Sequence, residues 1–236
     1  MNSIKRTARI AGVLYLLNAI TSGFAFAYVI AKVYMAGDAV TTAANIVANS
    51  GLVRIGVVAD LFQATVWIFL GMVLYLLFKQ VNKSMAGAMV VLVAVGAAIV
   101  CLNEVFEFAA LRVATDASYA AAIGVAGTDV LVLLLLDIHH YGFLIAQIFF
   151  GLWLVPLGYL SNRSGMFPKV LGIALIVGGA CYLVGLLAVF LVSDVGEKIN
   201  IFVTIPSAIA EIWMVLYLLV IGVRIVKPDE RVPAES

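Results

Sequence analysis

Six long apolar segments restrict what this chain can fold into. They lie at about residues 10–34, 55–78, 85–111, 131–160, 169–192 and 201–226. The hydrocarbon core of a bilayer is about 30 Å thick, so a helix needs about 20 mostly apolar residues to cross it. We therefore predict an all-α integral membrane bundle of six transmembrane helices, which forms a single domain over residues 1–236.

The overall composition supports a membrane protein. Hydrophobic residues make up 65% of the chain and charged residues 11%, whereas a soluble domain has about 45–50% apolar and about 25% charged residues. The net charge of +1 argues against a nucleic-acid partner. Lys5, Arg6 and Arg9 precede the first apolar segment, as in a signal peptide, but that segment is too long for one. We interpret it as the first transmembrane helix.

The positive charges predict how the helices are oriented. The cytoplasmic loops of membrane proteins carry an excess of lysine and arginine. The two chain ends and the second and fourth connections carry Lys5, Arg6, Arg9, Lys79, Lys83, Arg163, Lys169, Arg224, Lys227 and Arg231. The opposite side carries only Lys32, Arg54, Arg112 and Lys198. This asymmetry predicts that both termini are cytoplasmic.

Five carboxylates lie inside or at the edge of the apolar segments: Asp60, Glu104, Glu107, Asp137 and Glu211. A charge in the bilayer centre costs at least about 2.5 kcal/mol, so such residues usually face the bundle interior or a water-filled cavity. A helix rises about 1.5 Å per residue, and counting from the cytoplasmic ends places most of them toward the outer side. We therefore expect an outward-facing polar pocket lined by the second, third, fourth and sixth spans.

Helix periodicity indicates which side chains line this pocket. Positions three, four and seven apart share a helix face, and the polar residues share their faces with glycine or alanine, which mark close helix contacts in membranes. On the fourth span this spacing pairs His140 with Gln147. The expected ligand-binding residues are Arg54, Asp60, Gln63, Asn103, Glu104, Glu107, His139, His140, Gln147 and Glu211. Pro206, five residues before Glu211, predicts a kink beside it.

Several motifs resemble a known family. They are the stretches RIGVVADL at 54–61, VNK at 81–83, HHYG at 139–142 and FGLWLVPLGY at 150–159, the 164–168 turn, and Pro206 with Glu211. Over about residues 6–226 the chain resembles a bacterial family of six-span membrane proteins known only as domain of unknown function 4386. The resemblance implies the bacterial plasma membrane and no established activity. It also implies that Arg54, Asp60, His139, Gln147, Pro206 and Glu211 occupy family motif positions. The resemblance points to His139 as the histidine that faces the pocket, whereas helix periodicity favours His140, and both are kept as candidates.

Three functions fit these residues. The first is binding or transport of a small polar or amphipathic ligand, such as a lipid headgroup, linked to protonation of the carboxylates. The second is a metal-dependent intramembrane enzyme of hydrolase type. Its divalent metal would be held by Glu104, Glu107, His139 and His140, because two carboxylates three residues apart can reach one ion. The third is a structural or accessory subunit in which Asp60 pairs with Arg54, Glu107 with Arg112, and Glu211 with an asparagine or a tyrosine. Membrane lipid is an expected partner, and assembly into a homo-oligomer is left open.

Overall fold

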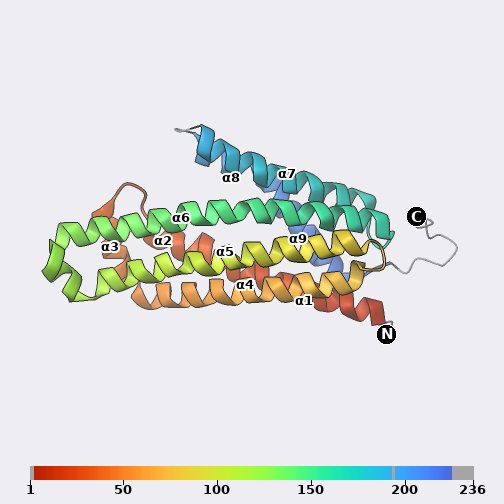
Figure 1. Ribbon diagram of the computed structural model, residues 1–236, viewed down its shortest axis with the longest axis horizontal. Coiled ribbons are helices and arrows are strands. Elements are labelled where there is room, and N and C mark those ends of the chain that lie inside the picture. Colours follow the sequence, from red (N-terminus) through yellow and green to blue (C-terminus); the bar gives the residue numbers. More distant parts are fainter. Residues whose placement is uncertain (1–2, 193–194, 225–236) are drawn as a thin grey trace. The chain divides into compact units, whose positions relative to one another are not determined.

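The computed structural model describes residues 3–192 and 195–224, and all its regular elements in these ranges are helices (Figure 1). In chain order they are α1 (Ser3–Ser22), η1 (Gly23–Ile30), α2 (Ala31–Val33), α3 (Ala39–Ala48), α4 (Ser50–Phe78), α5 (Lys83–Thr115), α6 (Ala117–Ser164), α7 (Lys169–Leu191), α8 (Gly196–Val203) and α9 (Ile205–Val220). η1 is a π-helix within the first span. Lys227 and Arg231, used above to orient the chain, lie outside the described residues.

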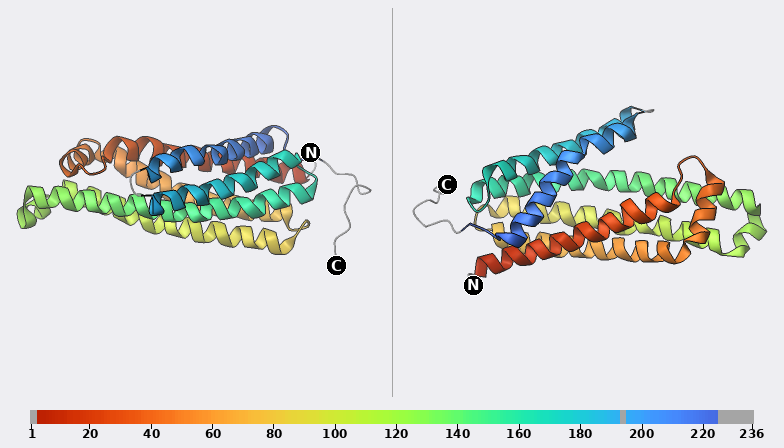
Figure 2. Two further views of the ribbon diagram at one scale, coloured as in Figure 1. Left: turned by 90° about the horizontal axis from the view of Figure 1, so that it is seen from above. Right: turned by 180° about the vertical axis from the view of Figure 1, so that it is seen from behind.

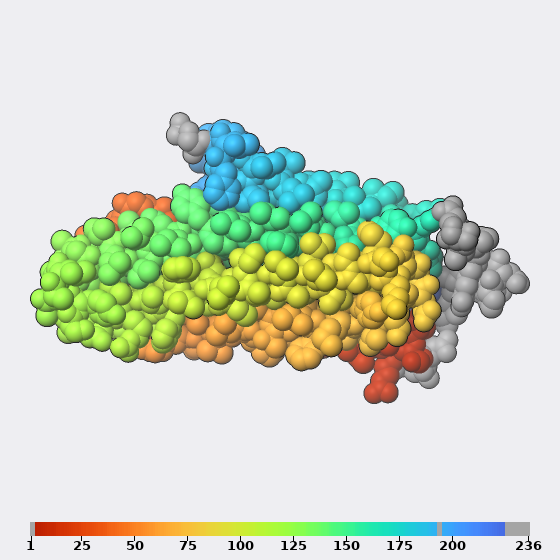
Figure 3. All heavy atoms as spheres, in the orientation of Figure 1, coloured from red at the N-terminus to blue at the C-terminus, as the bar shows by residue number. Residues whose placement is uncertain are grey.

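Six helical stretches are long and apolar enough to cross a membrane. They are Ser3–Val33, Ser50–Phe78, Lys83–Thr115, Ala117–Ser164, Lys169–Leu191 and Gly196–Val220. Figure 3 draws all heavy atoms of the chain. The described residues expose many large apolar side chains, among them Leu102, Leu191 and Phe202. Such a surface suits lipid. The predicted all-α bundle of six transmembrane helices is confirmed, and cytoplasmic termini stay a prediction.

Contacts between residues divide the described chain into two compact units. Unit 1 comprises residues 3–16 and 67–96 together with the described residues from Gln147 onward. Unit 2 comprises Leu17–Val66 and Ala97–Ala146. The division falls within α1, α4, α5 and α6, so each of these helices contributes to both units.

In unit 1, α7 packs against α8 and α9 (Figure 2). Glycines allow close approach of α6 to α7: a Cβ added at Gly151 would lie 2.6 Å from the backbone oxygen of Gly179, and one added at Gly179 would lie 2.6 Å from the oxygen of Gly151. Small residues at such crossings let membrane helices make backbone contact. This contact fixes where the end of α6 meets α7.

The core of unit 2 joins the end of the first span, α3 and parts of α4, α5 and α6. Its buried members are Val33, Ala43, Ile46, Val53, Ala110, Leu111, Val113, Val132 and Leu136. The short helix α3 begins where Asp38 accepts a hydrogen bond from the Thr41 amide at 2.9 Å. This side chain caps the free amides of the first turn.

Two helix breaks differ from the sequence expectation. The stretch 112–130, which lies outside the predicted spans, is mostly helical and turns at Gly124, whose φ of 75° favours glycine. The sixth span is interrupted between α8 and α9 at Thr204, and Pro206 lies in the first turn of α9. Proline is tolerated in a first turn because its missing amide has no partner there in any helix. The expected kink therefore takes the form of a helix start.

Candidate metal centre

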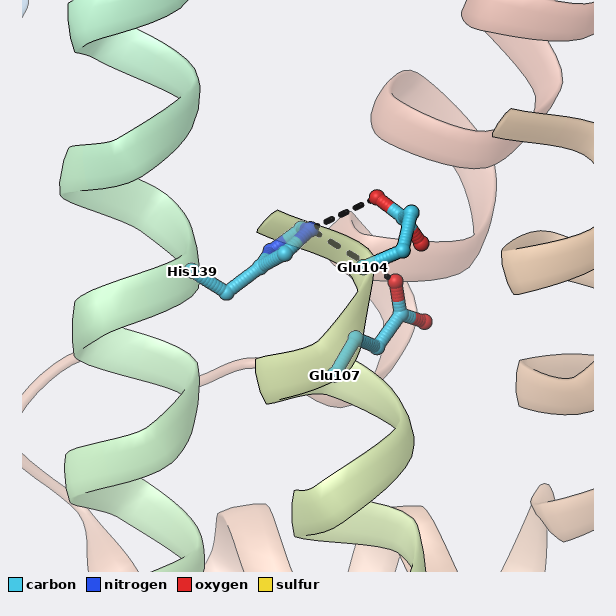
Figure 4. A group of neighbouring side chains, drawn as sticks. All are labelled: Glu104, Glu107 and His139. Carbon is cyan, nitrogen blue, oxygen red and sulfur yellow. Dashed lines mark hydrogen bonds and ion pairs between the residues drawn. The ribbon is translucent and has the colours of Figure 1, made fainter. Parts of the chain in front are cut away.

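Two glutamates and one histidine meet in the interior of unit 2 (Figure 4). Glu104 and Glu107 lie three residues apart on α5, which places both carboxylates on one face. His139 reaches toward them from α6, with its Nε2 atom 3.2 Å from Oε1 of Glu104 and 3.7 Å from Oε2 of Glu107. The residues are at most 3% exposed. One potential ligand atom from each residue lies within 4.8 Å of the other two.

Part of the hydrogen-bonding capacity of this group is unused. Oε2 of Glu104 and Oε1 of Glu107 are buried, and neither has a hydrogen-bond partner among the described residues. Leaving a buried polar atom unsatisfied costs about 1–3 kcal/mol, more for a charged group. Two buried carboxylates, each with an unpartnered oxygen, therefore favour the binding of a cation or a proton, which would accept the oxygen lone pairs.

A third carboxylate adds to the negative charge. Asp60 on α4 is 3% exposed and interacts electrostatically with both Glu104 and Glu107. Among the described residues, no lysine or arginine forms an ion pair with any of the three, since Arg112 pairs with Asp116 at 3.2 Å. Buried carboxylates are normally paired or bound to metal. The local charge thus suits a cation or protons.

The remaining predicted pocket residues of unit 2 have other partners. Asn103 donates from Nδ2 to the backbone oxygen of His139 at 2.8 Å. Gln63 donates to Oδ1 of Asn18 at 2.9 Å. His140 stacks on the ring of Tyr34, whose hydroxyl donates to Asp137 at 2.6 Å.

Arg54 is exposed, and in the described chain it forms no ion pair with Asp60. Within that part of the chain, the pairs of Asp60 with Arg54 and of Glu107 with Arg112, expected for a structural protein, are not formed.

Glu211 belongs to unit 1 and forms a separate polar group. Its Oε1 accepts a hydrogen bond from the Tyr15 hydroxyl at 2.7 Å, and its Oε2 accepts one from the Tyr182 hydroxyl at 2.9 Å. Both carboxyl oxygens are therefore satisfied by side chains from two other spans. From the sequence, an asparagine or a tyrosine was expected to pair with Glu211. Tyr15 and Tyr182 could not be identified as these partners in advance, because tyrosine is also an ordinary residue of membrane helices.

Gln147 also lies in unit 1. Its Nε2 donates to the backbone oxygen of Tyr182 at 2.8 Å and to Oδ1 of Asn200 at 2.9 Å. Asn200 was not singled out from the sequence, since it lies near the start of the sixth span in a short helix. These bonds tie α6 to α7 and α8. Gln147 and Glu211 thus have partners of their own, whereas the buried carboxylate oxygens without a hydrogen-bond partner among the described residues are those of Glu104 and Glu107.

The geometry of the three-residue group suits one metal ion. Zn²⁺ binds histidine nitrogen and carboxylate oxygen at about 2.0–2.2 Å in tetrahedral geometry, which places ligand atoms about 3.3–3.6 Å apart. Nε2 of His139 lies 3.2 Å from Oε1 of Glu104 and 3.7 Å from Oε2 of Glu107, close to this spacing. Glu104, Glu107 and His139 are therefore the residues that could hold a metal, and His140, which faces Tyr34, is not part of the group.

Comparison with known proteins gives the family but no activity. No curated protein and no solved structure matches the chain. A family model described as "Domain of unknown function (DUF4386)" matches residues 10–222, a range that includes all or most of each transmembrane segment and every residue of the three-residue group. The chain therefore belongs to the DUF4386 family of membrane proteins.

Proposed function

We propose that this protein binds a divalent transition-metal cation within the membrane through Glu104, Glu107 and His139. The observation that carries the proposal is the buried convergence of these three side chains, two of which retain an oxygen without a partner among the described residues. One divalent cation held among the three side chains would offset two negative charges of the carboxylates of Asp60, Glu104 and Glu107.

The donor set indicates which cations fit. Two carboxylate oxygens and one imidazole nitrogen suit Zn²⁺, Mn²⁺ or Fe²⁺, because imidazole favours transition metals and carboxylates favour harder ions. No thiolate belongs to the group, which argues against Cu⁺. We therefore expect a first-row divalent cation.

The number of ligands favours a reactive metal over a structural one. Structural zinc sites usually have four protein ligands, whereas catalytic sites have three and keep a position for water or substrate. A metal of this kind activates water for hydrolysis. We propose a metal-dependent membrane enzyme of hydrolase type. Because the group lies on membrane-spanning helices, its substrate needs an apolar part, and amphipathic molecules such as lipids are the class that fits.

Metal analysis tests the proposal. The protein, purified in detergent without chelators and then loaded with Mn²⁺ or Zn²⁺, is expected to retain about one ion per chain. Glu104→Gln, Glu107→Gln and His139→Ala are each expected to lose most of it. Glu211→Gln is the matched control, because it replaces a carboxyl group on a membrane-spanning helix whose oxygens already have partners. Wild-type protein that retains no ion, or a control that loses metal equally, would refute the centre.

Cobalt substitution tests the open coordination position. Co²⁺ bound by three protein ligands is expected to show an absorption spectrum that changes on addition of azide, because the anion enters the free position. A spectrum indifferent to azide would indicate a closed structural site and would refute the enzymatic part of the proposal.

The setting of the protein is also part of the proposal. The family resemblance supports the bacterial plasma membrane, and the lysine and arginine asymmetry supports cytoplasmic termini. Partners other than membrane lipid, including a small ligand in an outward-facing pocket or a second copy of the chain, stay predictions. Accessibility of single cysteines placed at Ser84 and Ser118 to a membrane-impermeant reagent tests the orientation, with the cysteine at position 118 expected to react from outside.

A further inference from the structure

We propose that Asn103 and Gly142 form a positioning pair that sets the geometry of the metal centre, an inference that rests on the proposed function. The amide of Asn103 donates to the backbone oxygen of His139 at 2.8 Å. Asn103 directly precedes Glu104 and lies four residues before Glu107, on the same side of α5. One hydrogen bond therefore joins the backbone of the residue that supplies the imidazole to the helix segment that supplies both carboxylates.

Gly142 makes this hydrogen bond sterically feasible. A Cβ added at Gly142 would collide with Oδ1 of Asn103 and would lie 2.8 Å from its Cγ. The Asn103 side chain is the flexible partner in this collision and could move aside, but only by giving up its bond to His139. The residue is 5% exposed, so water cannot easily replace the lost partner. Glycine at position 142 is thus required for Asn103 to hold α6.

The pair constrains the register of the two helices at the centre. A slide of α6 by one residue would move the imidazole by about 1.5 Å along the axis and turn it by about 100°. Functional constellations tolerate about 0.5 Å of displacement. The Asn103 side chain bonds to the backbone of His139, the residue that carries the imidazole. The bond therefore resists a slide of α6 at the metal centre.

The test compares this pair with a second contact between a polar residue and a glycine, which lies outside the metal centre. Ser207 on α9 donates from Oγ to the backbone oxygen of Gly178 at 2.6 Å, and a Cβ added at Gly178 would lie 2.9 Å from the Cα of Ser207. Asn103→Ala and Gly142→Ala are therefore matched by Ser207→Ala and Gly178→Ala. For each variant, the Kd for Mn²⁺ is measured by chelator competition, and the thermal midpoint is measured without metal.

We expect Asn103→Ala and Gly142→Ala to weaken Mn²⁺ binding about 10- to 100-fold, the range for outer residues that orient metal ligands. The Co²⁺ spectra of both variants should shift, because the ligand geometry relaxes. Ser207→Ala and Gly178→Ala are expected to lower the thermal midpoint by a similar amount while binding Mn²⁺ within about twofold of wild type.

The double variant adds an internal check. With the Asn103 amide removed, the methyl group introduced by Gly142→Ala has no amide to collide with, so Asn103→Ala/Gly142→Ala should bind Mn²⁺ no more weakly than Asn103→Ala alone. Additive losses would overturn the pairing. Unchanged affinity in both single variants, or an equal loss in the controls, would overturn the positioning role while the centre stands. Wild-type protein that binds no Mn²⁺ would overturn the proposed function and this inference together.

Discussion

Replacing Tyr15 by phenylalanine tests whether Glu211 is held by its two tyrosines. The substitution removes the hydroxyl that donates to Oε1 at 2.7 Å and keeps the ring, which packs on Trp153 with centroids 5.4 Å apart. The freed oxygen of Glu211 lies on a membrane-spanning helix, where water is scarce, so it gains no ready replacement. The loss is therefore confined to one interhelical hydrogen bond.

The expected magnitude follows from the kind of bond. Side-chain hydrogen bonds between membrane helices contribute about 0.6 kcal/mol on average and up to about 1.7 kcal/mol. We therefore expect Tyr15→Phe to lower the free energy of unfolding by about 0.6–1.7 kcal/mol. Tyr182→Phe, which affects the other oxygen, should cost about the same. The double variant should lose more than the sum, because both oxygens are then bare.

Reversible unfolding in mixed micelles, followed by circular dichroism, measures these differences. Tyr217→Phe is the control, because that hydroxyl donates to the Met166 oxygen over 3.4 Å, a long and weak bond. It should change the free energy of unfolding by less than about 0.5 kcal/mol. If Tyr15→Phe proved no more destabilising than Tyr217→Phe, or if the two tyrosines acted additively, the shared-carboxylate argument would be refuted.

Two further predictions concern packing and capping. Gly151→Ala should destabilise the protein by about 1–3 kcal/mol, because its Cβ meets the backbone oxygen of Gly179; Gly87→Ala, with no atom within 4 Å of its Cβ, should be neutral or stabilising in the same unfolding assay. Hydrogen bonds from the side chain and amide of Thr41 lower the pKa of Asp38 below its ordinary value of 3.8. This cap therefore contributes fully above that value and is lost as the pH falls through the lowered pKa. Hydrogen exchange should show the first turn of α3 opening only in acid, and Asp38→Asn should remove this pH dependence.

Much of the fold could be predicted because the number and length of the apolar segments determine it. All six spans were expected, and the largest difference in their bounds lies between the third and the fourth, where α5 and α6 extend beyond the apolar runs. That extension depends on local capping: Asp116 accepts bonds from the amide and hydroxyl of Ser118 and starts α6. The residues there are small and weakly polar, so the sequence alone did not distinguish helix from loop.

The choice between His139 and His140 shows why helix phase was less informative. The pairing of His140 with Gln147 assumed that both polar residues serve one site, whereas Gln147 bonds to Tyr182 and Asn200 in unit 1. The buried apolar residues Val132 and Leu136 lie seven and three residues before His139 and mark its inward face. In a membrane helix the lipid-facing side is apolar too, so this pattern could not be recognised from hydrophobicity.

The hydroxyl of Tyr15 meets its acceptor 196 positions later in the chain. As the protein is synthesised, the first helix enters the lipid long before Glu211 leaves the ribosome. Until the last span is inserted, the Tyr15 hydroxyl lacks its final acceptor and must bond to another group. A chain truncated before Glu211 should therefore insert its early helices but leave the N-terminal helix accessible to membrane proteases. The final span thereby supplies the partner that holds the N-terminal helix in place.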